Sequence, residues 1–129
     1  MGSLSDRLEP LFASALGEDA VTVDADGAPA LGVSEAVVRV HPATVDQVGD
    51  ALRVAVENDI VVVPTGSGAS LTQGNIAHDD IILLSTSKLD QTIDYEPRDL
   101  TAILQAGKTV AALAEETGAE GQMLALDPP

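Results

Sequence analysis

The sequence contains no cysteine and no tryptophan, and its only aromatic side chains are Phe12 and Tyr95. Without cysteine, the chain can form no disulfide, no thiolate metal site and no cysteine nucleophile. Because aromatic side chains normally contribute much of the buried area of a core, a core here has to rely on Val, Ile, Leu and Ala. The apolar share of 45% over 129 residues is sufficient for one folded domain.

Cations are also scarce, with 6 Lys and Arg against 21 Asp and Glu, a formal net charge of −15. The only lysines are Lys88 and Lys108. So few cations cannot form a basic patch, so we expect neither nucleic acid nor an anionic membrane surface as a partner. A charge this far from zero is tolerated best where salt screens the repulsion, which favours a halophilic, salt-adapted protein.

Long hydrophobic runs are missing as well. The runs at residues 60–63 and 81–84, like every other apolar run of the sequence, are far shorter than the roughly 20 residues of a membrane-spanning helix. Asp6 and Arg7 follow the initial Met-Gly-Ser without an apolar stretch, which is not a secretion signal. We therefore expect a cytoplasmic protein that is not inserted in a membrane.

Periodicity and cap signals predict an alternation of helices and strands. The first half should hold a helix capped by Ser5 or Asp6, strands at 21–23, 36–40 and 60–63, and a helix capped by Thr44 with Val45, Val48, Leu52, Ala55 and Val56 buried. The second half should hold a central strand at 81–85, an antiparallel pair at 92–95 and 101–105, and a helix capped by Thr109 with Val110, Leu113 and Ala114 inward. Strand, helix and strand over residues 36–63 imply a right-handed parallel crossover.

A glycine-rich loop follows the second strand of this crossover, at the edge where open parallel sheets bind ligands. Glycines stand at positions 66, 68 and 74 with small residues between them. Such a backbone can turn sharply and direct successive N–H groups at a phosphate or diphosphate. The loop is not the dinucleotide fingerprint, which needs glycine at Leu71, and it lacks the Gly-Lys-Ser/Thr ending of a Walker loop. By itself it could still be only a long turn between strands.

Other candidate sites are weaker. Gly107, Lys108 and Thr109 look like the end of a Walker motif, but Ala102 stands where its first glycine belongs, so we interpret Thr109 as a helix cap and Lys108 as a solvated charge. His41 and His78 are isolated from other ligand-type residues, so we take both as surface residues and expect no metal site.

Four ordered segments place the loop in a wider pattern. Residues 64–70 fit a Pro-x-Gly-x-Gly-[Thr/Ala/His]-Ser loop, and residues 99–107 are similar to an Asp-Leu-Thr segment that ends in Ala-Gly. Residues 82–90 are similar to a Leu-Ser-x-x-Leu-Asp/Asn segment, although three residues, not two, stand between Ser85 and Leu89 here. Together they resemble the FAD-binding domain shared by vanillyl-alcohol oxidase, p-cresol methylhydroxylase (PCMH) and FAD-linked 2-hydroxy acid oxidases. The closing residues 121–129 look most like the FAD-binding subunit of glycolate oxidase. The similarity covers residues 35–129.

The resemblance implies an α+β fold of the PCMH type, with a small parallel β-α-β sheet flanked by helices and the start of a second, antiparallel sheet. It divides the chain into an N-terminal helix and connector, residues 1–34, and the N-terminal part of an FAD-binding domain, residues 35–129. It also implies FAD as cofactor. The candidate cofactor-binding residues are Pro64, Thr65, Gly66, Ser67, Gly68, Ala69, Ser70, Gly74 and Pro128. In the family, the position of Ala69 often holds a histidine bonded to the flavin, so we expect non-covalent FAD here.

By the same resemblance, the parent enzyme would be a flavin-dependent oxidoreductase that oxidises a 2-hydroxy acid such as glycolate, with other subunits of an oxidase complex as candidate partners. The family's second glycine-rich segment and its substrate domain are not in this chain. We therefore expect an incomplete, inactive fragment and assign no catalytic residue. Two alternatives stay open: a non-catalytic phosphate- or nucleotide-binding module, and a structural half-domain completed by a partner subunit.

The charge balance generates the first prediction. The repulsion between 21 carboxylates acts over about 30 Å at 0.01 M salt but only about 3 Å at 1 M. The melting temperature should therefore rise steeply as KCl is added, which thermal unfolding followed by circular dichroism measures. A flat response would contradict salt adaptation.

Overall fold

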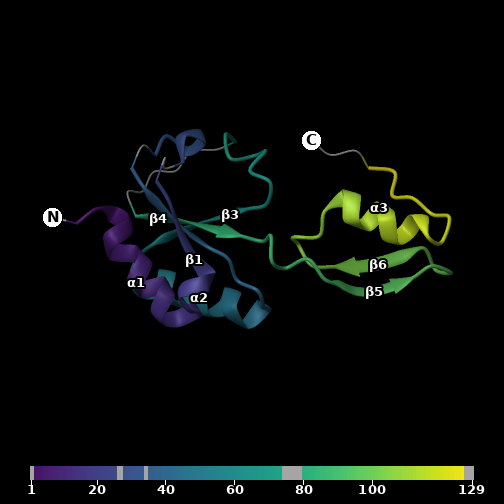
Figure 1. Cartoon of the computed structure of the whole chain (residues 1–129), viewed down its shortest axis with the longest axis horizontal. Helices are drawn as coiled ribbons and strands as arrows, with labels where there is room; N and C mark the ends of the chain where they lie inside the picture. The colour runs from purple at the N-terminus through teal and green to yellow at the C-terminus, as the bar shows by residue number, and fades with distance from the viewer. Residues whose placement is uncertain (1, 26–27, 34, 74–79, 127–129) are drawn as a thin grey trace.

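The computed structural model describes residues 2–25, 28–33, 35–73 and 80–126. Its elements are α1 (Leu4–Leu16), β1 (Val21–Asp24), β2 (Val37–Val40), α2 (Val45–Glu57), β3 (Val61–Thr65), β4 (Ile81–Ser85), β5 (Thr92–Glu96), β6 (Thr101–Leu104) and α3 (Val110–Gly118). Two short 3-10 turns, η1 (Glu18–Ala20) and η2 (Pro29–Leu31), lie on either side of β1. The chain forms a first lobe up to β4 and a second lobe from β5 onward (Figure 1). This arrangement confirms the predicted fold class.

The first lobe is built on a four-stranded sheet with the order β1-β2-β4-β3. Strand β4 pairs in parallel with both β2 and β3, and β1 closes the other edge antiparallel to β2. All five residues of β4 are buried, which confirms the predicted central position. The predicted β-α-β unit is present, but β4 lies between its two strands, so the connection through α2 passes over β4.

Each face of this sheet is covered differently. Helices α1 and α2 pack on the face that carries Val38, Val40, Ile82 and Leu84, and Phe12 of α1 is fully buried there. The connector around η2 covers the other face through a smaller cluster of Ala28, Val37, Ile81 and Leu83. One aromatic residue and many aliphatic side chains therefore suffice to bury both faces of the central strand.

The N-cap residue was predicted correctly for two of the three described helices. Thr44 and Thr109 are the N-caps of α2 and α3, as predicted; their hydroxyls accept from amides three residues on, at 3.2 and 3.1 Å. The prediction of Ser5 or Asp6 for α1 is wrong, because Ser3 caps this helix. The Ser3 hydroxyl accepts from the Asp6 amide at 3.2 Å and the Asp6 carboxylate accepts from the Ser3 amide at 2.8 Å. This reciprocal capping box begins the helix at Leu4.

The buried face of α2 differs from the prediction. Val45 and Val56 are 71% and 81% exposed and Leu52 is 44% exposed, whereas Ala51 and Ala55 are buried. Alanine lets a helix approach its neighbours closely, so the small residues face α1 and the sheet while three larger ones lie outward. Apolar spacing alone gave the correct helix, and Ala55 and Val48 do face the core as predicted, but Val45, Leu52 and Val56 do not.

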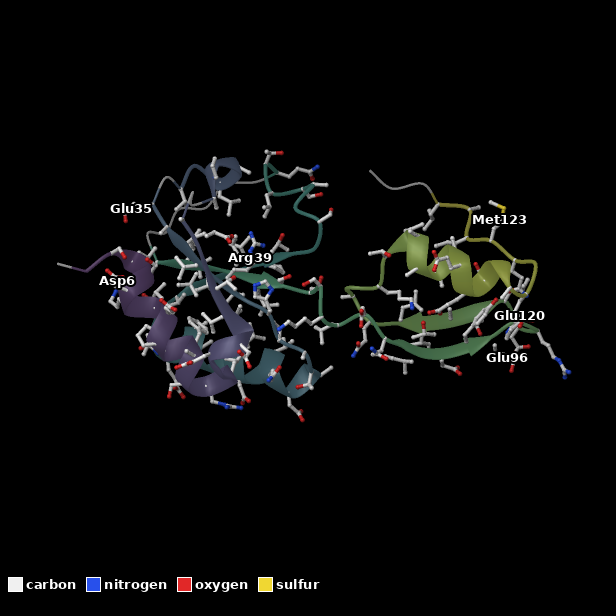
Figure 2. All side chains as sticks on the ribbon, viewed as in Figure 1. Asp6, Glu35, Arg39, Glu96, Glu120 and Met123 are labelled. Carbon is white, nitrogen blue, oxygen red and sulfur yellow. The ribbon has the colours of Figure 1, made fainter. Side chains whose placement is uncertain are left out.

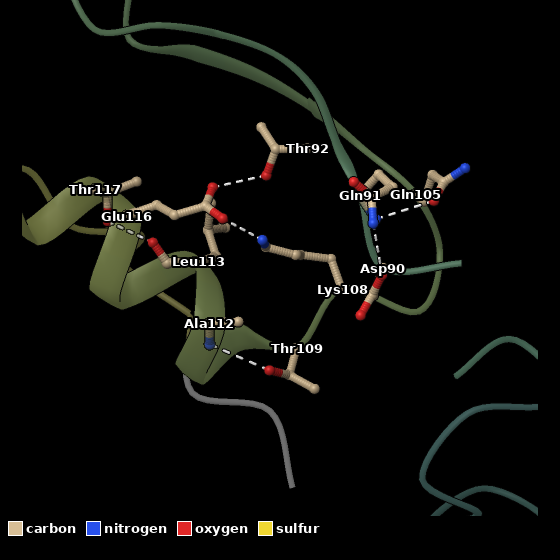
Figure 3. A network of polar contacts seen from close by, with 10 residues as sticks. All are labelled: Asp90, Gln91, Thr92, Gln105, Lys108, Thr109, Ala112, Leu113, Glu116 and Thr117. Atoms are coloured by element: carbon tan, nitrogen blue, oxygen red, sulfur yellow. Dashed lines mark hydrogen bonds and ion pairs between the residues drawn. The ribbon is translucent and has the colours of Figure 1, made fainter. Parts of the chain in front are cut away.

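In the second lobe, α3 packs against the β5–β6 hairpin, whose antiparallel pairing was predicted. Leu113 is buried as expected, but the other buried residue of α3 is Thr117, not Val110 or Ala114. The prediction that Lys108 is a solvated charge is also wrong, because its side chain is only 10% exposed and forms an ion pair with Glu116 (Figure 3).

Glu116 joins the helix to the hairpin. Thr92 of β5 donates to its carboxylate at 2.6 Å, and Lys108 pairs with its other oxygen. These hydrogen bonds, first that from Lys108 and then that from Thr92, lower the pKa of Glu116 below its ordinary value. The network therefore keeps this carboxylate charged while fixing α3 on the hairpin.

Backbone contacts join the second lobe to the segment that leaves β4. The Gly107 amide donates to the Leu89 carbonyl at 2.7 Å. A Cβ added to Gly107 would lie 1.8 Å from the Thr86 carbonyl oxygen and 2.8 Å from that of Leu89. Since the Thr86 amide in turn donates to the Thr65 carbonyl of β3 at 3.0 Å, the lobes meet through close backbone contacts.

This contact predicts that Gly107→Ala lowers the free energy of unfolding by about 2 kcal/mol or more, because backbone atoms cannot yield to the added methyl group. Gly49→Ala is the matched control, since nothing lies within 4 Å of a Cβ at this position of α2. It should stabilise the chain by about 0.5–1 kcal/mol through helix propensity. Urea denaturation measures both, and equal stabilities would contradict the close contact.

Candidate functional site

A cavity of about 490 Å³ opens beside β3 and the glycine-rich loop that follows it. It is lined by Leu31, Val61, Val62, Val63, Pro64, Thr65, Gly66, Ser67, Gly68, Ala69, Ser70, Leu71 and Gln73. The loop extends from the carboxyl end of β3 as the teal segment in Figure 1. The cavity therefore lies where the topology of a parallel sheet places a ligand.

The structure brings seven of the nine predicted cofactor-binding residues together, since residues 64–70 all line this cavity. Gly74 and Pro128 lie outside the described residues. Sequence reasoning missed Leu71 and Gln73, which close the loop, and Leu31, which η2 brings from the connector to the cavity. No pattern in residues 18–34 indicates that contact, because it arises only when the connector folds over the sheet.

The loop backbone is shaped by one glycine in particular. Gly68 has φ of 87°, a left-handed conformation that a branched side chain adopts only with strain. Gly66 is not among the positive-φ residues, and a Cβ on it would meet only the Thr86 hydroxyl at 3.9 Å. Conformational freedom is therefore required at position 68, whereas Gly66 keeps the backbone uncovered.

Amide groups of the loop are available to a ligand. The amides of Leu71 and Gln73 donate to the Gly68 and Ser70 carbonyls at 3.2 and 3.0 Å and close two turns. The four amides of residues 67–70 make no hydrogen bond to any other described residue. Consecutive unpaired N–H groups of this kind form a seat for an anion.

Strand β3 does not stop at its proline, contrary to the prediction, but continues through Pro64 to Thr65. Since β3 is the edge strand of the sheet, proline is tolerated there. Thr65 is 5% exposed, and its hydroxyl has no hydrogen-bond partner in the described part of the chain. A buried polar atom without a partner typically costs about 1–3 kcal/mol, so this hydroxyl calls for an explanation.

No charged side chain is among the described residues that line the cavity, although the chain carries 21 carboxylates. Figure 2 shows acidic side chains over both lobes, Asp6 and Glu35 on the first, Glu96 and Glu120 on the second. Four cations pair with carboxylates away from the cavity: Arg7 with Asp80, Arg39 with Asp24, Arg53 with Asp50 and Lys108 with Glu116. The described lining of the cavity is thus neutral in a strongly negative molecule.

The histidines take no part in this site as far as the structure describes them. His41 is only partly exposed, and its Nε2 lies 2.9 Å from the Thr22 hydroxyl in a hydrogen bond at the surface. Partial burial, then the charges of Lys88 and Arg39, lower the pKa of His41. His78 lies outside the described residues. Within the described ranges, no group of three or more His, Asp or Glu could hold a metal ion, and no helix is long and apolar enough to cross a membrane.

Comparison with solved structures shows the fold. The structure of 4-ethylphenol oxidase from Gulosibacter chungangensis with isoeugenol superposes with a TM-score of 0.74 at 18% identity, covering 97% of this chain and 26% of that one. That of p-cresol methylhydroxylase with substrate bound gives a TM-score of 0.72 at 19% identity, covering 92% and 25%. The chain therefore has the PCMH-type fold, and spans about a quarter of these structures.

Comparison of sequences shows the family. D-2-hydroxyglutarate dehydrogenase of Xanthomonas citri pv. viticola is 28% identical over 86 residues, 67% of this chain and 18% of that protein. D-lactate dehydrogenase of Anaerostipes hadrus is 23% identical over 97 residues, 75% and 20%. The chain thus spans about a fifth of the length of these curated relatives. The sequence model of the FAD binding domain family matches residues 36–129, well over half of the chain. This protein belongs to the FAD binding domain family, and its cofactor is FAD.

Proposed function

We propose that the loop of residues 66–70 seats the diphosphate of FAD, and that the chain serves a flavin-dependent oxidoreductase acting on a 2-hydroxy acid. The observation that carries the first part is the row of four unpaired amides beside a cavity whose described lining holds no carboxylate. Consecutive amides are donors that a diphosphate requires, and Gly68 supplies the left-handed backbone conformation of this loop.

The charge distribution supports this assignment. In a chain with a formal net charge of −15, a dianionic group is repelled from most of the surface. Among the described residues, the cavity lining offers such a group only amides, hydroxyls and one side-chain amide. The unpartnered Thr65 hydroxyl adds a donor at the end of β3. The residues present therefore fit FAD.

The substrate class is supported by the relatives. Their names, D-2-hydroxyglutarate dehydrogenase and D-lactate dehydrogenase, both denote enzymes of 2-hydroxy acids. We therefore propose a 2-hydroxy acid as the substrate of the whole enzyme, with glycolate as one member of that class. Bound flavin would accept the hydride from such a substrate.

This chain's own part in catalysis is to hold and orient the cofactor. No carboxylate, imidazole or lysine is among the described residues that line the cavity, so none can accept the substrate proton there. We therefore assign no catalytic acid or base to these residues. We propose that another domain or subunit of the enzyme supplies the catalytic acid or base. We also propose that the enzyme is a cytoplasmic oxidase.

The loop geometry predicts the effect of Gly68→Val. Since φ of 87° is strained for valine, the loop should change shape and FAD affinity should fall by about tenfold or more. Gly121→Val is the matched control: this glycine also has a positive φ, 68°, but lies after α3 and does not line the cavity. Quenching of flavin fluorescence on titration measures the affinity. Equal affinities for the two variants would contradict the assignment.

Ala69 predicts how the flavin is attached. Its methyl group cannot form a covalent bond to the flavin, and the chain has no cysteine to provide another linkage. Acid denaturation of the FAD-loaded chain followed by filtration should therefore leave all of the yellow colour in the filtrate. Flavin mass retained on the polypeptide in mass spectrometry would show that the attachment is covalent.

A further inference from the structure

Thr65 differs from the other buried hydroxyl residues of the described chain. Ser5 shares a hydrogen bond with Ser3 at 2.8 Å, Ser85 donates to Ser87 at 2.9 Å, and Thr117 donates to the Leu113 carbonyl at 3.0 Å. Thr65 alone among these four has a side-chain oxygen with no partner among the described residues. Since buried polar groups are almost always paired, this hydroxyl is a position at which a ligand can supply the hydrogen-bond partner.

Its neighbours do not supply that partner. Thr65 lies in register with Ser85 of β4, but the Ser85 hydroxyl is engaged by the hydroxyl and the amide of Ser87. The Thr65 carbonyl accepts from the Thr86 amide at 3.0 Å, which fixes the backbone at the end of β3. Thr65 thus stands on a fixed backbone, one residue away from the four unpaired amides, and it lines the same cavity.

We propose, resting on the function proposed above, that the Thr65 hydroxyl donates a hydrogen bond to a phosphate oxygen of FAD, and that neutral donors alone hold the diphosphate. Hydrogen bonds to an ionised acceptor are about twice as strong as neutral ones, so a phosphate is a favourable partner. Because the hydroxyl oxygen is covered in this conformation, the proposal includes a local displacement of the atoms that cover it when the ligand enters.

The described lining holds no charged side chain, and this is why we propose that neutral donors alone hold the diphosphate. Sites that hold phosphates by ion pairs lose affinity steeply as salt rises, because cations compete for the phosphate. Amide and hydroxyl donors carry no net charge and escape this competition. Added salt also screens the repulsion between the anionic ligand and a chain of net charge −15. ADP binding should therefore persist, or tighten, in concentrated salt.

The test compares the wild-type chain with Thr65→Val and Thr65→Ser by isothermal titration with ADP and with FAD. Valine keeps the branched shape and removes only the hydroxyl, so both affinities should fall by about tenfold, while serine should stay within about twofold. Thr101→Val, at an exposed position of β6 outside the cavity, is the control and should bind as wild type. The unliganded Thr65→Val chain should melt no lower than wild type, because it loses an unpartnered hydroxyl.

A second titration follows ADP affinity of the wild-type chain from about 0.2 M to about 2 M KCl, where a site of several ion pairs would lose more than tenfold. Unchanged or tighter ADP binding supports the proposal that neutral donors hold the diphosphate. A tenfold loss of ADP affinity overturns that part of the proposal. Binding of ADP and FAD by Thr65→Val within about twofold of wild type overturns the role of the hydroxyl, and leaves the proposed function standing. Failure of the wild-type chain to bind FAD overturns both.

Discussion

The parallel pairing of β4 with β2 and with β3 is the interaction on which the candidate site depends. It brings the carboxyl ends of β3 and β4 to the same edge of the sheet, where the Thr86 amide donates to the Thr65 carbonyl. The glycine-rich loop leaves from one of these strands and the connection to the second lobe from the other. The loop and the connection to the second lobe therefore both begin at this edge of the sheet. The close backbone contact of Gly107 with Thr86 joins the second lobe to the same place.

Electrostatics restricts where an anionic cofactor can bind on this molecule. Among the described residues, four cations are paired with carboxylates outside the cavity, and the chain's 21 acidic residues far outnumber its 6 cations. The described cavity lining is free of charge, so none of these lining residues repels a diphosphate. A site of amides and hydroxyls is consistent with this composition, since a basic phosphate site would have to draw on very few lysines and arginines.

Much of the architecture was predictable because its signals are local. The cap residues Thr44 and Thr109, the apolar run of β4 and the turn between β5 and β6 each act within a few residues, and each was identified correctly. Errors arose in the choice of the buried residues of α2, which buries Ala51 as well as the predicted Ala55 but exposes Val56, because close approach to α1 favours small residues. Lys108 was wrongly predicted to be solvated because its partner Glu116 lies eight residues on, within α3.

By itself, the sequence determined the glycine-rich loop, its position after a strand, and the ordered segments that identify an FAD binding domain. These features are contiguous in the sequence, so they can be recognised without knowledge of the tertiary contacts. Only the tertiary structure decided that Leu31 reaches the cavity, that charged residues keep clear of its described lining, and that the Thr65 hydroxyl is buried without a partner. Burial and pairing depend on residues distant in sequence, and no local pattern records them.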